Sequence, residues 1–196
     1  MIAETPRMII RNWRDDDLDL FHQINSDERV MEFFPFRLNR IEAGEKMQAQ
    51  CRIIEDTGFG FFAVERKSDC QPIGFAGLAQ ANVYPCLPQN AVEIGWRLAH
   101  EYWGNGYASE AAHALLATGF DERGLDEIVS FAVTDNARST AVMKRLGMLP
   151  DPQRDFDHPR VPDTHPQLKR HVLYSMSADD WKKQKDIAIS PGTSGS

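Results

Sequence analysis

The order of elements after residue 90 constrains the fold more than any other feature of this sequence. AVEIGWRL (residues 91–98) alternates apolar and polar side chains, which predicts a strand. A loop with two glycines follows, and apolar residues then recur at helical spacing from Ala108 to Phe120, which predicts an amphipathic helix. EIVSFAV (residues 127–133) predicts a second strand, and residues 136–146 predict a second helix. This alternation of strands and helices predicts that part of the sheet is parallel.

The residues before this unit predict further strands and helices. Asn39 is followed three residues later by Glu42, the pattern of a capping box at a helix start, and Gly58 is placed to end that helix. Two β-rich runs on either side of the polar turn KSDCQ then favour an antiparallel hairpin. The expected strands of this half are 8–13, 59–66 and 72–79, and the expected helices begin after residues 15–17 and at residue 39.

The length of 196 residues suits a single domain, which we place at residues 1–185. Near its end, RHVLYSM predicts a last strand, and Ser177 and Asp180 have the spacing that opens a helix. The chain finishes with SPGTSGS, which is small, polar and broken by proline. We therefore expect residues 186–196 to form a disordered tail.

The charge and the cysteines narrow the classes of partner. A formal charge of −7 argues against binding of nucleic acid, which needs a basic face, and suits a cationic amine substrate. Three cysteines without CxxC spacing indicate free thiols in a reducing compartment. No apolar run approaches the roughly 18–20 residues of a membrane span, and the N-terminus lacks the apolar core of a signal peptide. We expect a cytoplasmic protein with no membrane partner.

The loop WGNGYA (residues 103–108) lies between an expected strand and an expected helix. Gly104 and Gly106 allow a tight turn and let a ligand approach the backbone closely. The first turn of the helix supplies unpaired N–H groups and the positive end of the helix dipole, which suits a pyrophosphate. A plain helix start is the alternative. The loop has neither the Gly-Lys-Ser/Thr of a Walker loop nor the GxGxxG of a dinucleotide fold.

Three motifs in this order resemble the GNAT superfamily of N-acetyltransferases, and within it the RimJ/RimL-like branch of ribosomal-protein acetyltransferases. WGNGYA is similar to the glycine-rich phosphate loop of the family, and the longer run 93–111 is similar to that branch. NARSTAVMKRLGM (residues 136–148) resembles its N-x-x-S…K-x-L-G helix. TPRMIIRNWRDDDLDLF (residues 5–21) resembles its first strand and helix. The resemblance covers roughly residues 5–180.

The resemblance implies an α+β fold of three layers, α/β/α, with a mixed, mostly antiparallel sheet that is splayed at its centre and flanked by helices. It implies acetyl-CoA as acyl donor, an amine as acceptor, no metal, and a monomer or homodimer. In the family, pantetheine enters the gap beside the splayed strand and bonds to its backbone. By position, the cofactor-binding residues here would be Leu98, Ala99, Gly104, Asn105, Gly106, Tyr107, Ala108, Ser109, Asn136 and Ser139. For Asn136 a simple helix cap is the alternative.

Two residues are candidates for catalysis. Glu93 would take the proton of the amine, directly or through ordered water, and the alternative is a carboxylate bound to Arg97 on the same strand face. Many superfamily members carry a tyrosine that protonates the leaving thiolate, but this chain has Met143 there, which cannot donate a proton. Ser139 or water is left as the donor, since a serine hydroxyl can hydrogen-bond the departing sulfur. Otherwise Ser139 is a small cofactor-facing residue.

Aromatic residues and histidines mark two further segments. In the family, the region of VMEFFPF (residues 30–36) forms one wall of the acceptor cleft. Phe34 and Phe36 are therefore candidates for substrate binding, with core packing as the alternative. The histidines near the end of the chain fit no compact zinc motif, and we expect solvated loop residues, one of which could line the acceptor site. They are His158, His165 and His171.

The resemblance implies direct transfer of acetyl to a primary amine within a ternary complex. An α-amine with a pKa near 8 is about one-tenth neutral at pH 7, whereas a lysine near 10.4 is neutral in about one molecule in 2,500. A protein N-terminal α-amine therefore demands far less of a base, and we favour it as acceptor. A small-molecule amine (an amino acid, a polyamine or an antibiotic) is the alternative. A non-catalytic acyl-CoA-binding module is the second alternative.

Overall fold

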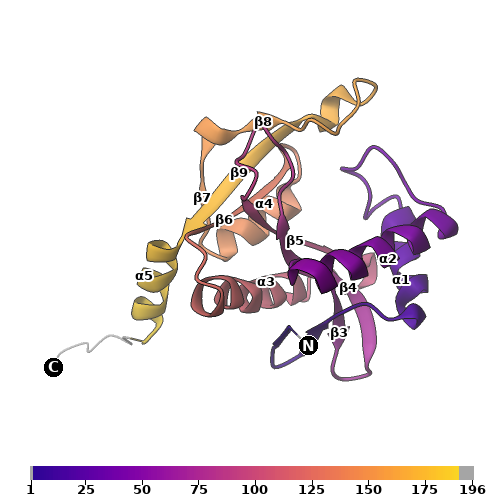
Figure 1. Ribbon diagram of the computed structural model, residues 1–196, viewed down its shortest axis with the longest axis horizontal. Coiled ribbons are helices and arrows are strands. Elements are labelled where there is room, and N and C mark those ends of the chain that lie inside the picture. The colour runs from indigo at the N-terminus through magenta and orange to yellow at the C-terminus, as the bar shows by residue number, and fades with distance from the viewer. Residues whose placement is uncertain (1, 190–196) are drawn as a thin grey trace.

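The computed structural model describes residues 2–189, which form one mixed sheet with helices on both faces (Figure 1). The strand order is β1-β2-β3-β4-β5-β6-β9-β7, with β8 also paired to β9. The strands are β1 (Ala3–Glu4), β2 (Met8–Arg11), β3 (Gly60–Arg66), β4 (Gln71–Gln80), β5 (Val92–Leu98), β6 (Glu127–Val133), β7 (Leu149–Pro150), β8 (Phe156–Asp157) and β9 (Arg170–Ser177). The helices are α1 (Leu18–Ser26), α2 (Arg40–Thr57), α3 (Tyr107–Ala117), α4 (Ala137–Arg145) and α5 (Ala178–Ile189). The short helical turns are η1 (Asp15–Asp17), η2 (His100–Tyr102), η3 (Thr118–Glu122), η4 (Pro152–Arg154) and η5 (Pro166–Leu168).

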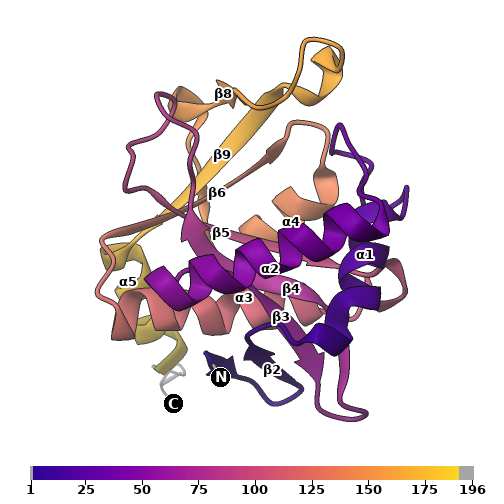
Figure 2. The same ribbon diagram turned by 45° about the vertical axis from the view of Figure 1, so that its right-hand side comes forward.

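Helices α1 and α2 cover one face of the sheet and α3 covers the other, so the expected three layers are present (Figures 1 and 2). The capping box at the start of α2 is confirmed. The Asn39 side chain accepts the amides of Ile41 and Glu42 at 2.9 and 3.0 Å, and the Glu42 carboxylate accepts the Asn39 amide at 2.8 Å. Gly58 ends the helix in the left-handed conformation, with φ of 70°.

The sheet splits at its centre, where its two parallel strands meet. Every other pair of neighbouring strands is antiparallel, but β5 and β6 are parallel and pair only at Glu93 and Val129 within the described residues. One residue further, the Ser130 hydroxyl donates to the Ile94 carbonyl at 2.9 Å. This bond lies at the apex of the split. Beyond it, the facing edges of β5 and β6 are no longer paired with each other. The mixed, splayed sheet expected from the sequence is therefore confirmed.

Three expected boundaries are wrong. Strand β2 ends at Arg11 rather than Trp13, because the Trp13 indole turns inward and donates to the Phe61 carbonyl at 2.8 Å. The helix expected to continue to residue 120 becomes a π-turn at Thr118–Glu122. Helix α5 continues to Ile189, so its last residues are not part of a disordered tail, while 190–196 lie outside the described residues. None of the helices in residues 2–189 combines the length and apolarity needed to cross a bilayer.

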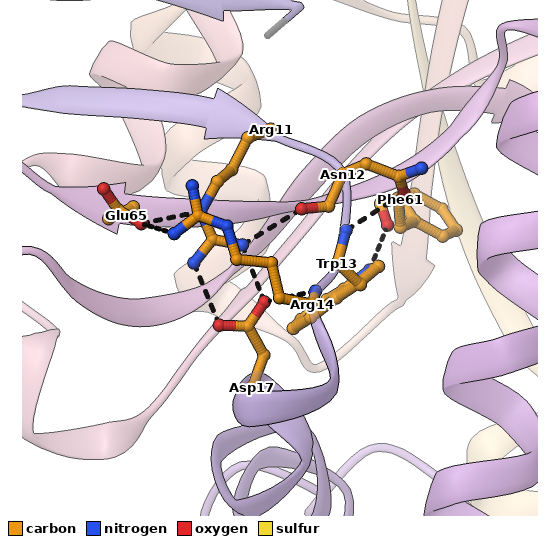
Figure 3. A network of polar contacts seen from close by, with 7 residues as sticks. All are labelled: Arg11, Asn12, Trp13, Arg14, Asp17, Phe61 and Glu65. Carbon is orange, nitrogen blue, oxygen red and sulfur yellow. Dashed lines mark hydrogen bonds and ion pairs between the residues drawn. The ribbon is translucent and has the colours of Figure 1, made fainter.

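An ion-pair network joins β2 to its neighbours (Figure 3). The Arg11 guanidinium donates to the Asp17 carboxylate at 2.6 and 2.9 Å and to the Glu65 carboxylate at 2.6 Å. Its side chain is only 7% exposed, and both carboxylates are similarly buried. Hydrogen bonds to Asp17 and then to Glu65 raise the pKa of Arg11. The network fastens β2, η1 and β3 together with its charges balanced.

Candidate active site at the split in the sheet

The two-glycine loop turns sharply at the end of β5 and delivers the chain into α3. Gly104 and Gly106 have φ of 76° and 78°, a region that favours glycine. A Cβ at Gly104 would meet nothing within 4 Å, and one at Gly106 would meet only the Arg7 side chain at 3.6 Å. The glycines are therefore required by the backbone turn, and the space outside the loop is open to a ligand.

The loop and the first turn of α3 present a row of free amides. Among residues 2–189, none of the amides of 104–109 donates to a protein acceptor, and the first helical bond runs from the Glu110 amide to the Gly106 carbonyl at 3.0 Å. Six consecutive N–H groups at a helix start, with the positive end of its dipole, form a site for an anion. Gly104, Asn105, Gly106, Tyr107, Ala108 and Ser109 are thus brought together as the sequence predicted.

Side chains from several elements hold this loop in place. The Trp103 indole donates to the Leu98 carbonyl at 2.9 Å, and the side-chain amide of Asn105 donates to the Trp103 carbonyl at 3.0 Å. Arg7 donates to the Asn105 carbonyl at 3.0 Å and to Glu110 at 2.6 Å. The loop is therefore fixed to the strand behind it, to the residue before β2 and to the helix ahead.

The backbone at the end of β5 is partly committed to other partners. The Ala99 amide donates to the Ile73 carbonyl at 3.0 Å and its carbonyl accepts the Tyr102 amide at 3.0 Å, so Ala99 has no free N–H for a cofactor. Its carbonyl is the backbone group that Ala99 could still offer, and cofactor binding by Ala99 stays a prediction. Gly74 and Leu98 face each other across the antiparallel pair, so the peptide groups of Leu98 point away from β4. Leu98 remains a candidate to bind a cofactor in the split.

Helix α4 begins on the other side of the split. The Asn136 side chain accepts the Ser139 amide at 3.1 Å, so it caps the helix, and cofactor binding by Asn136 stays a prediction. Ser139 is partly exposed, whereas Met143, one turn later, is 1% exposed and belongs to the core. Met143 is therefore a packing residue and has no access to a reacting group.

Glu93 lies at the apex of the split, where β5 and β6 still pair. Desolvation raises the pKa of its carboxyl to about 8, although the positive charge of Arg160 acts in the opposite direction. No ion pair joins Glu93 to Arg97 within the described residues, which overturns the structural alternative for Glu93. A carboxyl with this pKa accepts a proton more readily than an ordinary glutamate.

Arg97 lies on the same strand face as Glu93, and its partners are uncharged. Its guanidinium donates to the Asn25 side-chain carbonyl at 2.6 Å and lies 4.0 Å from the ring centre of Phe34 and 5.2 Å from that of Phe75. Burial lowers the pKa of Arg97 to about 10. The amide and the two rings hold the guanidinium in place without neutralising it.

Phe34 and Phe36 are 44% and 60% exposed, so core packing is wrong as an explanation for them. Phe36 meets the His165 ring edge-on at 5.9 Å, which brings the segment after α1 against the segment before β9. A pocket of about 380 Å³ lies between these two segments. Its lining includes Met31, Glu32, Phe34, Phe36, His165 and Leu168.

The other two histidines belong to an aromatic cluster. The rings of His158 and His171 are 4.9 Å apart, and His171 is stacked on Phe156 at 5.8 Å. His171 is 8% exposed, so the expectation of a solvated loop residue is wrong for it. Burial lowers the pKa of both rings, that of His158 to about 4, so His158 is neutral at pH 7.

Several residues of the site have no local signal in the sequence. The Arg145 guanidinium donates to the Ser109 hydroxyl at 2.7 Å, which places a positive charge beside the free amides. The Arg138 guanidinium is paired with Glu32 and lies 4.7 Å from the Trp103 ring centre. Arg145 follows Ser109 by 36 residues, and only the folded chain brings them together.

A split sheet with free amides at the helix start beyond it defines an acyl-CoA-dependent acyltransferase fold. Residues 7–149 match the model of the acetyltransferase (GNAT) domain, and the chain belongs to this family. It is an N-acetyltransferase, and the resemblance drawn from the sequence is confirmed.

Individual relatives agree with this assignment. The uncharacterized N-acetyltransferase YnaD of Bacillus subtilis is 30% identical over 148 residues, 76% of this chain and 82% of YnaD. The structure of RimL, a ribosomal L7/L12 alpha-N-protein acetyltransferase in complex with coenzyme A, has a TM-score of 0.70 at 16% identity and covers 91% of this chain and 98% of its own. A spermidine N-acetyltransferase chimera from Vibrio cholerae and hSSAT has a TM-score of 0.68 at 17% identity, with 89% and 98% covered. At these identities the two structures share the fold.

Proposed function

We propose that this protein transfers the acetyl group of acetyl-CoA to a primary α-amine, such as a protein N-terminus, by direct attack within a ternary complex. The observation that carries the proposal is the row of free amides at residues 104–109, which suits the pyrophosphate of coenzyme A. Arg145 adds a positive charge beside that row. The uncovered strand edges beyond Ile94 and Ser130 offer backbone groups to the pantetheine arm.

Glu93 is the residue that removes the proton of the amine. Its pKa of about 8 matches that of an α-ammonium group, so proton transfer between the two is nearly balanced. A lysine ammonium near pKa 10.4 is mismatched by more than 2 units, which adds roughly 3 kcal/mol. This match favours an α-amine over a lysine side chain.

The chemistry consists of one substitution at the thioester carbonyl. The neutral amine attacks the carbonyl carbon, a C–N bond forms and the C–S bond breaks. The amine proton goes to Glu93, which releases it to water, and the thiolate takes a proton from water, so the protons balance. Ser139 stabilises the departing sulfur with its hydroxyl, because Met143 is buried and has no proton to give.

A small-molecule amine is the second candidate acceptor, and the pocket between Phe34 and His165 favours it because a small ligand fits about 380 Å³. A polyamine fits less well. The charge that acts on Glu93 is the positive charge of Arg160, whereas a polyamine site needs carboxylates.

An acceptor panel tests the proposal. Acetyl-CoA is supplied with peptides that have a free N-terminus, with N-blocked peptides that contain lysine, and with spermidine, and release of free thiol is measured. Turnover should be highest with free N-termini. Turnover confined to lysine or spermidine would contradict the α-amine, and binding of acetyl-CoA without turnover of any amine would contradict the enzyme.

A matched pair of glycine variants tests the amide row. Gly106→Val should weaken acetyl-CoA binding more than about a hundredfold, since its side chain projects from the row and several charge-assisted bonds are lost. Gly124→Val is the control, because Gly124 also has positive φ (64°) and open space around it but lies outside the loop. Equal loss in both variants, measured by calorimetry, would show an effect of backbone strain alone.

A further inference from the structure

We propose that the acceptor carries a carboxylate in addition to its amine, and that Arg97, with Lys46 and Arg160, binds this carboxylate on the face of β5 that carries Glu93, which we call the acceptor cleft. This inference rests on the proposed function and names the class of its acceptor.

Arg97 has capacity for an anion that the described residues leave unused. One N–H bond goes to the Asn25 carbonyl, and the flat faces are covered by Phe34 and Phe75. No carboxylate in residues 2–189 lies within ion-pair distance of Arg97, whereas Arg11, the other strongly desolvated arginine, has two. A guanidinium held between rings, with N–H groups to spare, matches the planar fork of a carboxylate.

Two more cations, both with exposed side chains, come from other elements of the fold. Lys46 lies on α2, and Arg160 lies in the segment between β8 and η5. Neither has an ion-pair partner in the part of the chain that the structure describes. Desolvation and then the positive charges of Arg97 and Arg160 lower the pKa of Lys46, so the three groups lie close enough to interact.

The carboxyl group that faces these cations does not neutralise them. Arg160 acts on the pKa of Glu93, which is nevertheless raised to about 8, so Glu93 is mostly uncharged at pH 7. The cleft therefore carries positive charge in a chain whose formal charge is −7. This positive charge favours an acceptor that carries an anionic group over one that carries a second cationic group.

Glu93 and Arg97 are far enough apart on β5 to contact the two ends of an extended acceptor. The two residues are four apart on one face of β5, which corresponds to roughly 13 Å along the strand. Gly95 lies between them without a side chain, and a Cβ there would be 2.9 Å from the ring of Phe61. An amine at Glu93 and a carboxylate near Arg97 can thus belong to one acceptor over an aromatic floor.

Two matched acceptor series test this inference and distinguish a protein N-terminus from a small molecule as the source of the carboxylate. The first consists of free N-terminal peptides with one Asp at position 1, 2 or 3, each compared with the Asn peptide. The second compares free amino acids with their α-carboxamides. We expect kcat/KM for the acid to exceed that for the amide at least about tenfold in one series. A larger acid-to-amide ratio of kcat/KM in the peptide series assigns an acidic protein N-terminus as acceptor. A larger ratio in the amino-acid series assigns a small amine that carries a carboxylate.

Variants connect the preference to the cleft. Lys46→Glu and Arg97→Gln should each lower the acid-to-amide ratio about tenfold, and a general folding defect would leave this ratio unchanged because both acceptors suffer equally. The control is Lys183→Glu on α5, a helix on the opposite side of the fold from α1 (Figures 1 and 2), and it should keep the ratio. Efficient acetylation of amines with ratios near one in both series would overturn the carboxylate while the proposed function stands. No acetylation of any amine would overturn the proposed function itself.

Discussion

Two desolvated arginines show how differently this protein treats buried charge. Arg11 donates to Asp17 and Glu65, and these bonds raise its pKa (Figure 3). Arg97 donates to an amide and lies against two rings, and burial lowers its pKa to about 10. One arginine completes a balanced network within the chain, while the other keeps an unbalanced charge at the edge of a cleft.

This comparison indicates that Arg11 stabilises the fold, whereas Arg97 binds a ligand. Removing one partner from a buried, balanced network leaves charges without compensation, which costs several kcal/mol. Removing Arg97 leaves no carboxylate behind, so stability should change little while acceptor recognition changes. Each prediction below tests this separation.

The largest expected effect is on stability at the balanced network. Arg11→Met should lower the free energy of unfolding by about 3 kcal/mol or more, since Asp17 and Glu65 stay buried with only Arg14 near them. Urea unfolding followed by circular dichroism measures the change. Arg97→Gln is the matched variant and should lose less than about 1.5 kcal/mol. Equal losses would erase the distinction between the two arginines.

The next effect is on turnover at the cleft. Glu93→Gln should lower kcat about a hundredfold, because the amide cannot accept the amine proton, and should leave KM for acetyl-CoA unchanged. In the wild type, kcat should rise with pH and level off above about pH 8, as Glu93 loses its proton. A pH–rate profile that is the same in both proteins would remove Glu93 from the mechanism.

The third effect is a dependence of stability on pH that has the opposite sign to that of a salt-bridged carboxylate. The pKa of Glu93 rises from 4.5 to about 8 on folding, so the folded state binds more protons between these values. The contribution of Glu93 to stability is therefore present below pH 4.5 and is lost as pH rises toward 8. As pH rises from 4.5 to about 8, the melting temperature of Glu93→Gln should increase relative to that of the wild type. A difference in melting temperature that does not change with pH would contradict the raised pKa.

The fourth effect concerns the cap of α4. Asn136→Ala should lower the free energy of unfolding by about 1 kcal/mol, since the Ser139 amide loses its acceptor. Asn136→Asp restores the cap and is the control. If Asn136 also binds the cofactor, the alanine variant should weaken acetyl-CoA binding more than the loss of the cap explains in a thermal-shift titration.

The smallest effect is expected at Ser139. Ser139→Ala should slow turnover by about threefold, because one hydrogen bond to the leaving sulfur is lost while water still supplies the proton. In single-turnover kinetics, the rate difference between wild type and Ser139→Ala should be smaller with an activated thioester, whose sulfur leaves more easily, than with acetyl-CoA. Identical rates for both proteins with acetyl-CoA would make Ser139 a packing residue.

Local chemistry made much of the fold predictable from sequence. The capping residues Asn39 and Glu42, the turn at Gly58 and the glycines of the loop act over a few positions, and each was found where expected. Strand β6 at Glu127–Val133 matches its predicted range because its β-branched residues lie between clear breaks.

The parts of the site that could not be predicted depend on contacts between distant residues. Arg97 meets Asn25 across 72 positions, and the two groups have no sequence pattern in common. Periodicity placed Glu93 and Arg97 on one face and suggested an ion pair between them. It could not show that Asn25 accepts one N–H of the Arg97 guanidinium and that Phe34 packs against its flat face. In the same way, the pairing of Ala99 with Ile73 decides which backbone groups remain available.

The indole of Trp103 has a consequence for the thermodynamics of cofactor binding. Its bond to the Leu98 carbonyl, together with the contacts of Asn105 and Arg7, sets the loop in one conformation before any ligand arrives. A preorganised loop loses little conformational entropy on association, so more of the interaction energy appears as affinity. Replacing Trp103 by phenylalanine would keep an aromatic ring but free the loop, and the entropy of binding measured by calorimetry would become less favourable.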